Sequence, residues 1–478
     1  MKHLLTAISL LLLGSSMAHA QFSGTSLLEY QYGELPSANE SAFNAMYNKL
    51  NLNYRYKQLR IKAGVQYYIS PYSERNYVEP GWLGANYRNK GWDLSLGNFN
   101  ETIGRGILLR SYEIHGAVIE DLSFRSKQYF YRDLLGASAG YRHKKFAFKA
   151  MYGMVLNNVI APTESISARR DDEIMAFTGE YKFLKQTIGG AFMHLSNAAE
   201  KTDYAMGNIS GRLFPFLNYY TAYASTVNGP SKGHAIYASL NMAINKFGLS
   251  VEWKDYDNFV IGSGINEPPA LVKEHSYRVL NRSTHVLQPD NESGFQIEAF
   301  YQASDNTLLT INHTVANNDF GADFNYREWF AEVSTSFNQS DLKIFADYAN
   351  DELKDEEDRI STGLNLEQKI KTKHGLLLEL EYQSFNRQSV NNQNVVTGLT
   401  YNYQSKLYWG VLNEWSNDTF ISDNEKFWLS TTIRYKLNSK NTFQLFAGER
   451  RGGPACSAGV CYEVLDFKGV ELRWMARF

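Results

Sequence analysis

The chain has 478 residues, and its 48 Lys and Arg against 50 Asp and Glu give a formal net charge of -2. This balance gives no reason to expect a nucleic-acid partner. The mean hydropathy of -0.40, with no later run of roughly 20 apolar residues, excludes a helical membrane protein. Yet 32 Tyr, 28 Phe and 8 Trp against only 10 Pro favour strands and suit the aromatic girdles of a membrane β-barrel.

The first twenty residues have the form of an export signal. A basic start precedes an apolar core from Leu4 to Leu13, and the small-residue motif Ala18-His19-Ala20 follows. The core is too short to span a bilayer as a helix, and no cysteine follows the motif to carry a lipid anchor. We therefore expect residues 1–20 to be a cleavable signal peptide.

The repeated unit of the remaining chain is a pair of alternating strands joined by a very short turn. Apolar and polar residues alternate on both sides of Lys57-Gln58 and of Asn245-Lys246, which predicts tight hairpins. Strands of about ten residues are the length that a tilted barrel strand needs. Further pairs are expected near residues 82–99, 134–156, 173–196, 205–226, 293–316, 326–350, 359–385, 394–416 and 427–450.

Together with one strand near each end of the mature chain, these pairs predict an all-β antiparallel meander of about 24 strands, within a range of about 18 to 26. In hydrocarbon only a helix or a closed barrel satisfies its own backbone. The prediction is therefore one transmembrane β-barrel domain over residues 21–478, located in the outer membrane. Because barrel turns are short on the periplasmic side and loops long outside, the following segments are expected to be extracellular: 157–171, 257–292, 350–358, 417–426 and 451–462.

Residues 100–133 do not fit the hairpin pattern. Their first part combines glycines, which allow close backbone approach, with Glu101, Arg105, Arg110 and Glu113. The two arginines can pair with the two glutamates or with a solute, which makes a constriction of the lumen one interpretation. An ordinary extracellular loop with solvated charges is the other, since only the length of the segment favours a function.

The longest segment between strands, 257–292, contains His275, Arg278 and His285. Loops this long are usually lids, plugs or binding elements, so a folded lid or plug is one expectation and a mobile surface loop the other. The spacing of the two histidines is a weak pattern for a metal site, and we predict none.

The acidic run between Asp351 and Asp358 is expected to be a solvated charged loop, because Lys354 interrupts it and no calcium-loop spacing appears. Bridging of divalent cations to anionic lipid is the alternative.

Cys456 and Cys461 are the only cysteines and lie in a glycine-rich turn. Because an exported chain meets an oxidising compartment, a local disulfide that pins the last outside loop is favoured over free thiols or a metal pair.

The chain ends on an alternating strand. Val470, Leu472, Trp474 and Phe478 fall on one face, and the charged residues between them fall on the other. One face suits lipid and the other water. The terminal aromatic resembles the signal that the barrel assembly machinery recognises, so Trp474 and Phe478 are predicted to direct assembly.

Residues 97–113, 267–277 with 280–286, and 452–478 resemble an uncharacterised outer-membrane β-barrel family of Bacteroidota, a domain of unknown function. The resemblance covers nearly the whole mature chain and implies a location and an architecture but no catalytic residue. The chain does not resemble TonB-dependent transporters, because no N-terminal globular plug precedes the first strands.

The leading functional hypothesis is a porin-like channel or conduit for a bulky solute or polymer, occluded by inserted loops. The alternative is a non-conducting surface barrel that binds polysaccharide, lipopolysaccharide or a partner protein. Inward-facing charges of both signs predict no strong ion selectivity. We expect no enzymatic activity and no cofactor. The expected partners are outer-membrane lipid with lipopolysaccharide, the barrel assembly machinery and an unidentified outer-membrane protein.

Overall fold

The computed structural model describes residues 20–36, 40–121, 126–158, 160–165, 169–273, 275–286, 288–418, 420–421, 426–457 and 460–478. The predicted signal peptide lies almost wholly outside these residues. Within them, no helix is both long enough and apolar enough to cross a bilayer.

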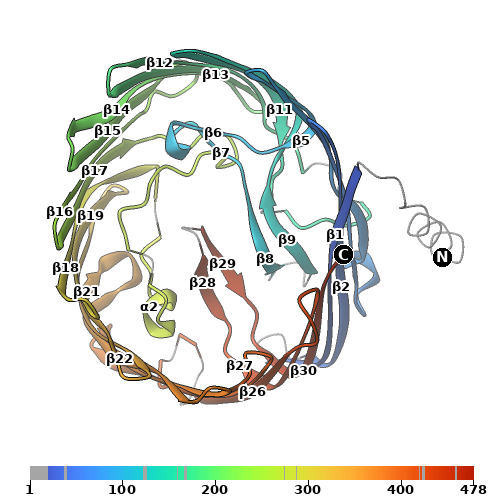
Figure 1. The fold of residues 1–478 in the computed structure, drawn as a ribbon, viewed down its shortest axis with the longest axis vertical. Coiled ribbons are helices and arrows are strands. Elements are labelled where there is room, and N and C mark those ends of the chain that lie inside the picture. Colours follow the sequence, from blue (N-terminus) through green and yellow to red (C-terminus); the bar gives the residue numbers. More distant parts are fainter. Residues whose placement is uncertain are drawn as a thin grey trace, which may run out of the picture.

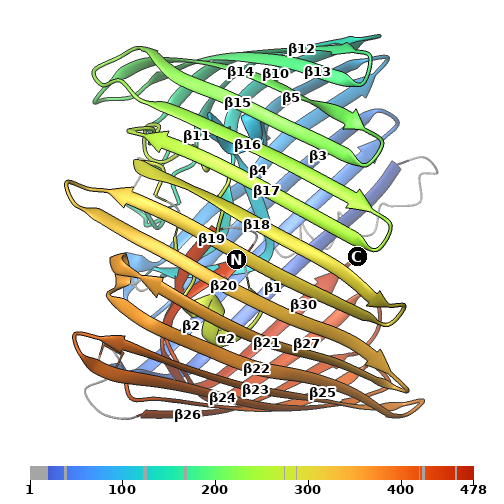
Figure 2. The same ribbon diagram turned by 90° about the vertical axis from the view of Figure 1, so that its left-hand side faces the viewer.

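Twenty-four antiparallel strands form one closed barrel, which confirms the predicted fold class and strand number (Figure 1). The last strand pairs with the first, and Phe478 exchanges two backbone hydrogen bonds with Gly24 at the seam. In side view the strands are strongly tilted (Figure 2). The barrel strands are β1 (Ala20–Leu35), β2 (Glu40–Tyr56), β3 (Leu59–Ile69), β4 (Tyr77–Asn89), β5 (Trp92–Phe99), β10 (Leu134–His143), β11 (Phe146–Val155), β12 (Glu173–Phe183), β13 (Gln186–Ser196), β14 (Lys201–Phe214), β15 (Leu217–Asn228), β16 (His234–Ile244), β17 (Phe247–Asp257), β18 (Asn291–Ser304), β19 (Thr307–Asp319), β20 (Asp323–Phe337), β21 (Ser340–Asp351), β22 (Glu356–Lys371), β23 (His374–Arg387), β24 (Val390–Tyr403), β25 (Leu407–Ser416), β26 (Lys426–Lys436), β27 (Asn441–Arg450) and β30 (Phe467–Arg477).

At one end of the barrel, which we call the short-turn end, consecutive strands are joined by two to four residues. The turn Lys90-Gly91 has φ angles of 45° and 91°, the left-handed values that a two-residue hairpin needs at both central positions. A Cβ atom at Gly91 would lie 2.3 Å from the carbonyl oxygen of Arg142, so only glycine fits there. All the long segments that were predicted from the sequence to be extracellular leave the wall at the opposite end, which we call the long-loop end.

The wall has an apolar outer face and a largely polar inner face. In β30 the side chain of Leu472 is 42% exposed, whereas Glu471 is 4% exposed and accepts a hydrogen bond from Gln31 at 2.7 Å. The period-two alternation that the sequence showed thus sorts residues between the outside and the lumen. Large apolar side chains exposed on the wall include Phe148, Phe177, Ile188, Trp253, Ile311, Trp329, Ile344, Leu399, Trp409 and Leu429.

Three insertions at the long-loop end turn into the lumen instead of standing outside it (Figure 1). Each leaves and re-enters the wall between residues that are paired in register: Phe99 with Leu134, Asp257 with Asn291, and Arg450 with Phe467. The expectation that segment 451–462 is an outside loop is therefore wrong. It forms a hairpin, β28 (Gly453–Ser457) with β29 (Val460–Val464), that lies inside the barrel beside the other two insertions.

The seam generates a prediction about assembly. Deleting Phe478 removes the two hydrogen bonds to Gly24, and Trp474→Asp places a carboxylate on the apolar outer face. A charge there costs up to about 2 to 4 kcal/mol at mid-depth and less near the interface. Both variants should therefore yield less heat-modifiable barrel in membrane fractions, read as a gel shift between unheated and boiled samples.

Gln444→Asp is the matched control, because Gln444 faces the lumen opposite Arg473 in the neighbouring strand. It adds the same charge without touching lipid and should assemble like the unaltered protein. Normal barrel levels in both seam variants would contradict an assembly role for the terminal strand.

Candidate functional site: the luminal plug

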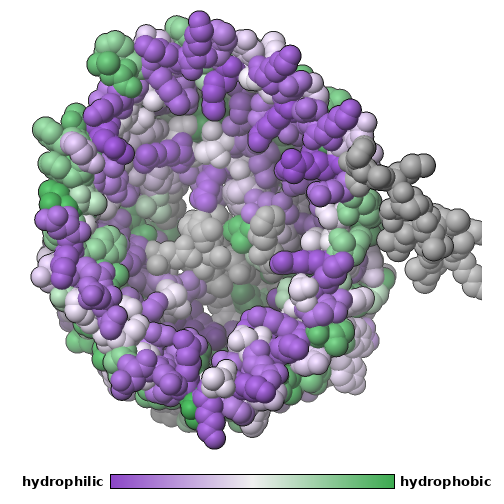
Figure 3. Space-filling view, viewed as in Figure 1, coloured by the Kyte–Doolittle hydropathy of each residue, from purple (hydrophilic) through white to green (hydrophobic). Residues whose placement is uncertain are grey.

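The lumen is occupied by the three insertions, which together we call the plug. Segment A (100–133) contains β6 (Thr102–Ile103), the 3-10 turn η3 (Gly104–Gly106), β7 (Leu109–Arg110), β8 (Tyr112–Asp121) and β9 (Ser126–Arg132). Segment B (258–290) contains the short helix α2 (Arg278–Arg282), and segment C (451–466) contains β28 and β29. In the space-filling view down the axis, hydrophilic side chains surround a hollow and apolar patches lie at the outer rim (Figure 3).

The four charged residues predicted to form a constriction all lie in segment A, and each of them contacts a residue outside this group of four. Arg110 contacts Glu267 of segment B at 3.0 Å. Arg105 lies with its guanidinium 3.8 Å from the ring centre of Tyr220 and donates to Ser239 at 3.3 Å. The contacts of the two arginines thus extend to segment B and to the inner wall, beyond the pairs that the sequence suggested.

The two glutamates bind lysines of the wall. Glu101 pairs with Lys149 of β11, and Glu113 lies 3.5 Å from Lys49 of β2. Lys127 of β9 likewise pairs with Glu29 of β1. Segment A is thus held to the barrel through charges on three separate strands.

Segments A and B are joined to each other through their backbones. Arg110 donates its amide to Ile265, and Glu267 donates to Gly106, each at 3.0 Å. Gly106 has a φ of 97°, and a Cβ atom there would lie 2.1 Å from the carbonyl oxygen of Glu267. The glycines of this segment do permit the close backbone approach that the sequence suggested. Burial raises the pKa of the Glu267 carboxyl, and the adjacent Arg132 and Arg110 oppose that rise.

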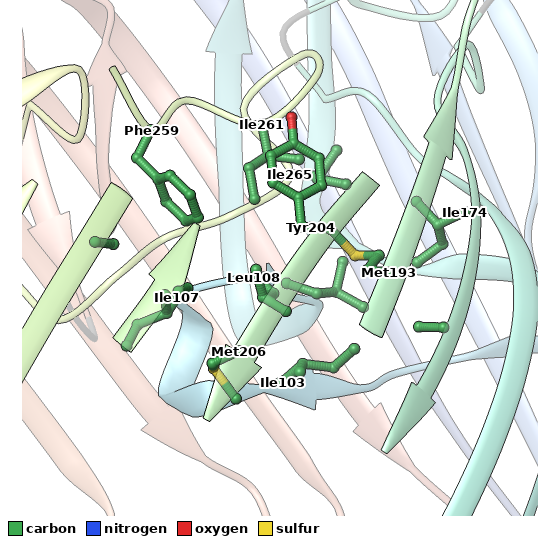
Figure 4. Packing of buried hydrophobic residues seen from close by; sticks show 14 of the residues in the cluster. Ile103, Ile107, Leu108, Ile174, Met193, Tyr204, Met206, Phe259, Ile261 and Ile265 are labelled. Atoms are coloured by element: carbon green, nitrogen blue, oxygen red, sulfur yellow. The ribbon is translucent and has the colours of Figure 1, made fainter. Parts of the chain in front are cut away.

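The first parts of segments A and B sit together on an apolar patch of the inner wall (Figure 4). Ile107 and Leu108 of segment A are fully buried, as is Phe259 of segment B. They pack against inward-facing residues of β12 to β14, namely Ile174, Met193, Leu195, Tyr204 and Met206. Burying each such side chain stabilises the docked plug by roughly 1.5 to 3 kcal/mol.

Segment B follows the inner wall from β18 to β25 and contacts five inward-facing carboxylates, which belong to β18, β20, β23 and β25. The contacts run in order along the chain: Lys273 with Glu298 (2.9 Å), His275 with Glu328 (3.2 Å), the Tyr277 hydroxyl with Glu332 (2.7 Å), the Val279 amide with Glu381 (2.9 Å) and Arg282 with Glu414. Little of this segment is regular secondary structure, so these contacts to the wall replace the internal hydrogen bonds that it lacks.

The three residues singled out in the long loop have different surroundings. His275 and His285 are both buried, and His285 lies 3.1 Å from Asp351 of β21. Arg278 lines a cavity beside α2 instead of joining the histidines. Among the described residues no group of three or more His, Cys, Asp or Glu side chains is arranged to hold a metal ion.

The expectation of a solvated loop at the acidic run fails for two of its residues. Asp351 is buried against His285, and Glu356 binds Arg359 and Arg387, each at 3.2 Å. Arg359, buried in the wall, also donates to the carbonyl of Ser283 at 3.0 Å. Part of the acidic run therefore fixes segment B.

Segment C inserts its hairpin between α2 and β8. Cys456 and Cys461 are directly opposite partners in the β28–β29 ladder. Their side chains lie outside the described part of the chain, so the disulfide stays a prediction. Arg451, at the base of the hairpin, donates to Asn394 of β24 at 3.1 Å.

The plug leaves open space in the lumen. A cavity of about 660 Å³ lies between α2, β28 and strands β23 to β27. Smaller cavities of about 300 Å³ and 330 Å³ adjoin it toward the long-loop end and the short-turn end. A separate cavity of about 620 Å³ lies below segment A, on the opposite side of the barrel. Ligand pockets typically have volumes of roughly 300 to 1,000 Å³, so each of these spaces can hold a small solute.

Two parts of this site were not found from the sequence. The wall carboxylates were interpreted as lining an aqueous lumen, whereas Glu381 and Glu414 bind the plug. The apolar inner patch had a visible signal: Ile174-Met175-Ala176-Phe177 is apolar on both faces of a strand. Such a run indicates burial on both sides, which a lipid-facing strand with a wet lumen does not need.

A family model matches residues 31–478, and its description is "Family of unknown function (DUF6029)". The chain belongs to this family. The Bacteroidota origin suggested by the sequence resemblance stays a prediction. No curated protein matches the chain.

Among solved structures, the outer membrane protein OpdK of Pseudomonas aeruginosa aligns at 12% identity with a TM-score of 0.41, over 70% of this chain and 94% of that protein. OccAB3 of Acinetobacter baumannii aligns at 9% identity with a TM-score of 0.43, over 70% and 94%. OccK9 (OpdG) of Pseudomonas aeruginosa aligns at 10% identity with a TM-score of 0.44, over 73% and 97%.

Because ion pairs hold segment B to the wall, we predict that removing one of them lowers the local stability of segment B. Arg282→Gln leaves the buried Glu414 without its cation, at a cost of about 2 kcal/mol. Hydrogen exchange at residues 278–283 should then accelerate roughly thirtyfold. Lys426→Gln is the control, because its pair with Glu449 is more exposed and is worth at most about 1 kcal/mol. Equal exchange rates in the two variants would refute the anchoring role.

The register of β28 and β29 generates a second prediction. Cys456 and Cys461 should be oxidised to each other in purified protein, because opposite positions of an antiparallel pair bring the two Cβ atoms within roughly 4.5 to 5.5 Å. The expected result is alkylation of both thiols only after reduction, measured by the mass of the peptide that spans 452–466. Complete alkylation without reductant would refute it.

Proposed function

We propose that this protein is an outer-membrane channel whose lumen is partly closed by its own plug, and that it conducts small or extended solutes through the space that the plug leaves. The observation that carries the proposal is the combination of a closed 24-stranded wall with three cavities that adjoin one another along one side of the lumen. Barrels of 16 to 18 strands already leave an aqueous channel, and those of about 22 strands need a plug.

The same reasoning supports the location. A closed barrel with apolar side chains outside is a fold that satisfies its backbone in hydrocarbon. We place the short-turn end in the periplasm and the long-loop end outside, where lipopolysaccharide would surround it. Assembly of such a barrel would use the barrel assembly machinery. We assign the chain no catalytic role.

A second candidate is a non-conducting surface barrel that presents its long-loop end to a polysaccharide, lipopolysaccharide or a partner protein. The observation that favours it is the apolar packing of segment A, where Ile107 and Leu108 are fully buried. A segment held this firmly keeps its half of the lumen closed, so only the other half is available for conduction.

Because each insertion joins residues already paired in the wall, each can be replaced by a two-residue Asn-Gly turn without changing strand register. Replacing residues 258–290 should raise single-channel conductance in planar bilayers and the sensitivity of cells to antibiotics too large for ordinary porins. Replacing residues 100–133 should do the same on the other side of the lumen. Arg105→Ala should change conductance little, because its contacts with Tyr220 and Ser239 are two among many.

The control is the three-residue turn at 404–406, at the short-turn end, which joins the paired residues Tyr403 and Leu407 and is shortened to Asn-Gly in the same way. It alters a loop without altering the plug, and conductance should not change. If the intact protein already conducts like an open wide pore and neither plug deletion alters that, the plug does not occlude the lumen. If the deletion variants assemble but none conducts, the surface-barrel candidate replaces the channel.

A further inference from the structure

The three adjoining cavities form one path along the inner surface of β22 to β27. The cavity near the short-turn end and the central cavity share Thr400, Gly410, Thr432 and Gln444. The central cavity and the one near the long-loop end share Arg282, Arg451, Gly453 and Pro454. A solute that moves along this path must therefore pass Arg282 and Arg451, at the place where α2 and the β28–β29 hairpin face each other.

This junction holds more positive than negative charge. Two carboxylates lie near Arg451, and each already has its own arginine. Arg282 binds both oxygens of Glu414, and Arg387 contacts both oxygens of Asp418 at 2.8 and 2.9 Å. The cavity toward the long-loop end also carries Lys354 and Glu356, and Glu356 contacts Arg387 and Arg359. Four cations (Arg282, Arg387, Arg451 and Lys354) thus face three carboxylates (Glu414, Asp418 and Glu356), and Arg451 is the one of the three arginines without an ion pair in the described part of the structure.

Arg451 itself is incompletely satisfied in the described part of the structure. Its hydrogen-bond acceptor is the neutral amide oxygen of Asn394, at 3.1 Å, and its guanidinium lies 5.6 Å from the ring centre of Trp428. Its Nε atom is buried without a hydrogen-bond acceptor. Burial and the neighbouring Arg282 lower the pKa of Arg451. A guanidinium nevertheless stays protonated in proteins, so what the environment lacks is an anion.

Of the other three carboxylates among the described residues that line the central cavity, two are already paired with cations. Glu449 is paired with Lys426, and Glu471 is paired with Arg450. Glu379 also lines the cavity but does not line the junction. Arg278 adds a further cation to the lining next to the junction.

We propose that the junction at Arg451 and Arg282 is an oxyanion-binding constriction, at which the carboxylate or phosphate group of a solute binds as it passes between α2 and the β28–β29 hairpin. The proposal deepens the proposed function by naming the class of solute. Guanidinium groups suit both chemistries, because their donors match the geometry of two anionic oxygens. The lumen as a whole is of mixed charge, so the preference for anions arises at this one point.

The test is equilibrium binding to the refolded full-length barrel in detergent, measured by isothermal titration calorimetry with citrate and, separately, with inorganic phosphate. Arg451→Gln should weaken binding of at least one probe by about tenfold or more, the size of one lost charge-assisted hydrogen bond. Glu414→Gln should strengthen it, because Arg282 then also lacks a carboxylate. Arg212→Gln is the matched control: Arg212 is an exposed arginine at the short-turn end of β14, away from all the cavities of the path.

The opposite responses of the two junction variants separate loss of a site from loss of folding. Binding that is equal in Arg451→Gln and the unaltered protein, or undetectable for both probes, would overturn the proposal. Binding requires no conduction. If the protein binds citrate through Arg451 but does not conduct, the oxyanion site stands and the channel proposal fails. If the protein conducts but binds neither probe, the channel proposal stands and the oxyanion site fails.

Discussion

Inward-facing carboxylates on the barrel wall are the feature on which the inner structure depends. A wall of 24 strands encloses far more space than its own side chains can fill, and period-two alternation places half of its residues in that space. Where those residues are glutamates, as at Glu298, Glu332, Glu381 and Glu414, they accept hydrogen bonds from a chain segment with little secondary structure of its own. The wall therefore acts as a template for segment B.

Apolar packing and polar contacts contribute in different proportions to the two sides of the plug. Segment A rests on an apolar patch, where separation from the wall would expose Ile107, Leu108 and their neighbours to water. The first part of segment B, up to Leu271, rests on the same patch. From Lys273 to Arg282 segment B adds charged and polar contacts with wall carboxylates to a smaller apolar cluster at Tyr277, Val279 and Leu280. Water and solutes can replace the polar contacts at lower cost than the apolar ones. The continuous cavities lie beside this later part of segment B. A conduction path between α2 and the β28–β29 hairpin is consistent with that division.

Attachment of each plug segment to a single hairpin explains how so large an insertion leaves the barrel regular. Phe99 and Leu134 stay paired across a 34-residue gap as if a short turn joined them. Strand register, set by the neighbouring ladders, does not depend on what the insertion does. The wall and the plug can thus differ in stability, and the plug can rearrange while the wall stays closed.

The sequence by itself determined the wall. Alternation, short turns such as Lys57-Gln58 and the terminal strand that ends at Phe478 are local signals, because strand pairing in a meander joins neighbours in the chain. Only the tertiary structure decided the lumen. Arg282 and Glu414 are 132 residues apart, and Lys127 and Glu29 are 98 apart, so no spacing in the sequence indicates these pairs. Closure of the barrel brings them together. The Cys456–Cys461 hairpin lies inside the barrel because it packs between α2 and β8, which are far from it in the sequence, whereas its own sequence indicated an outside loop.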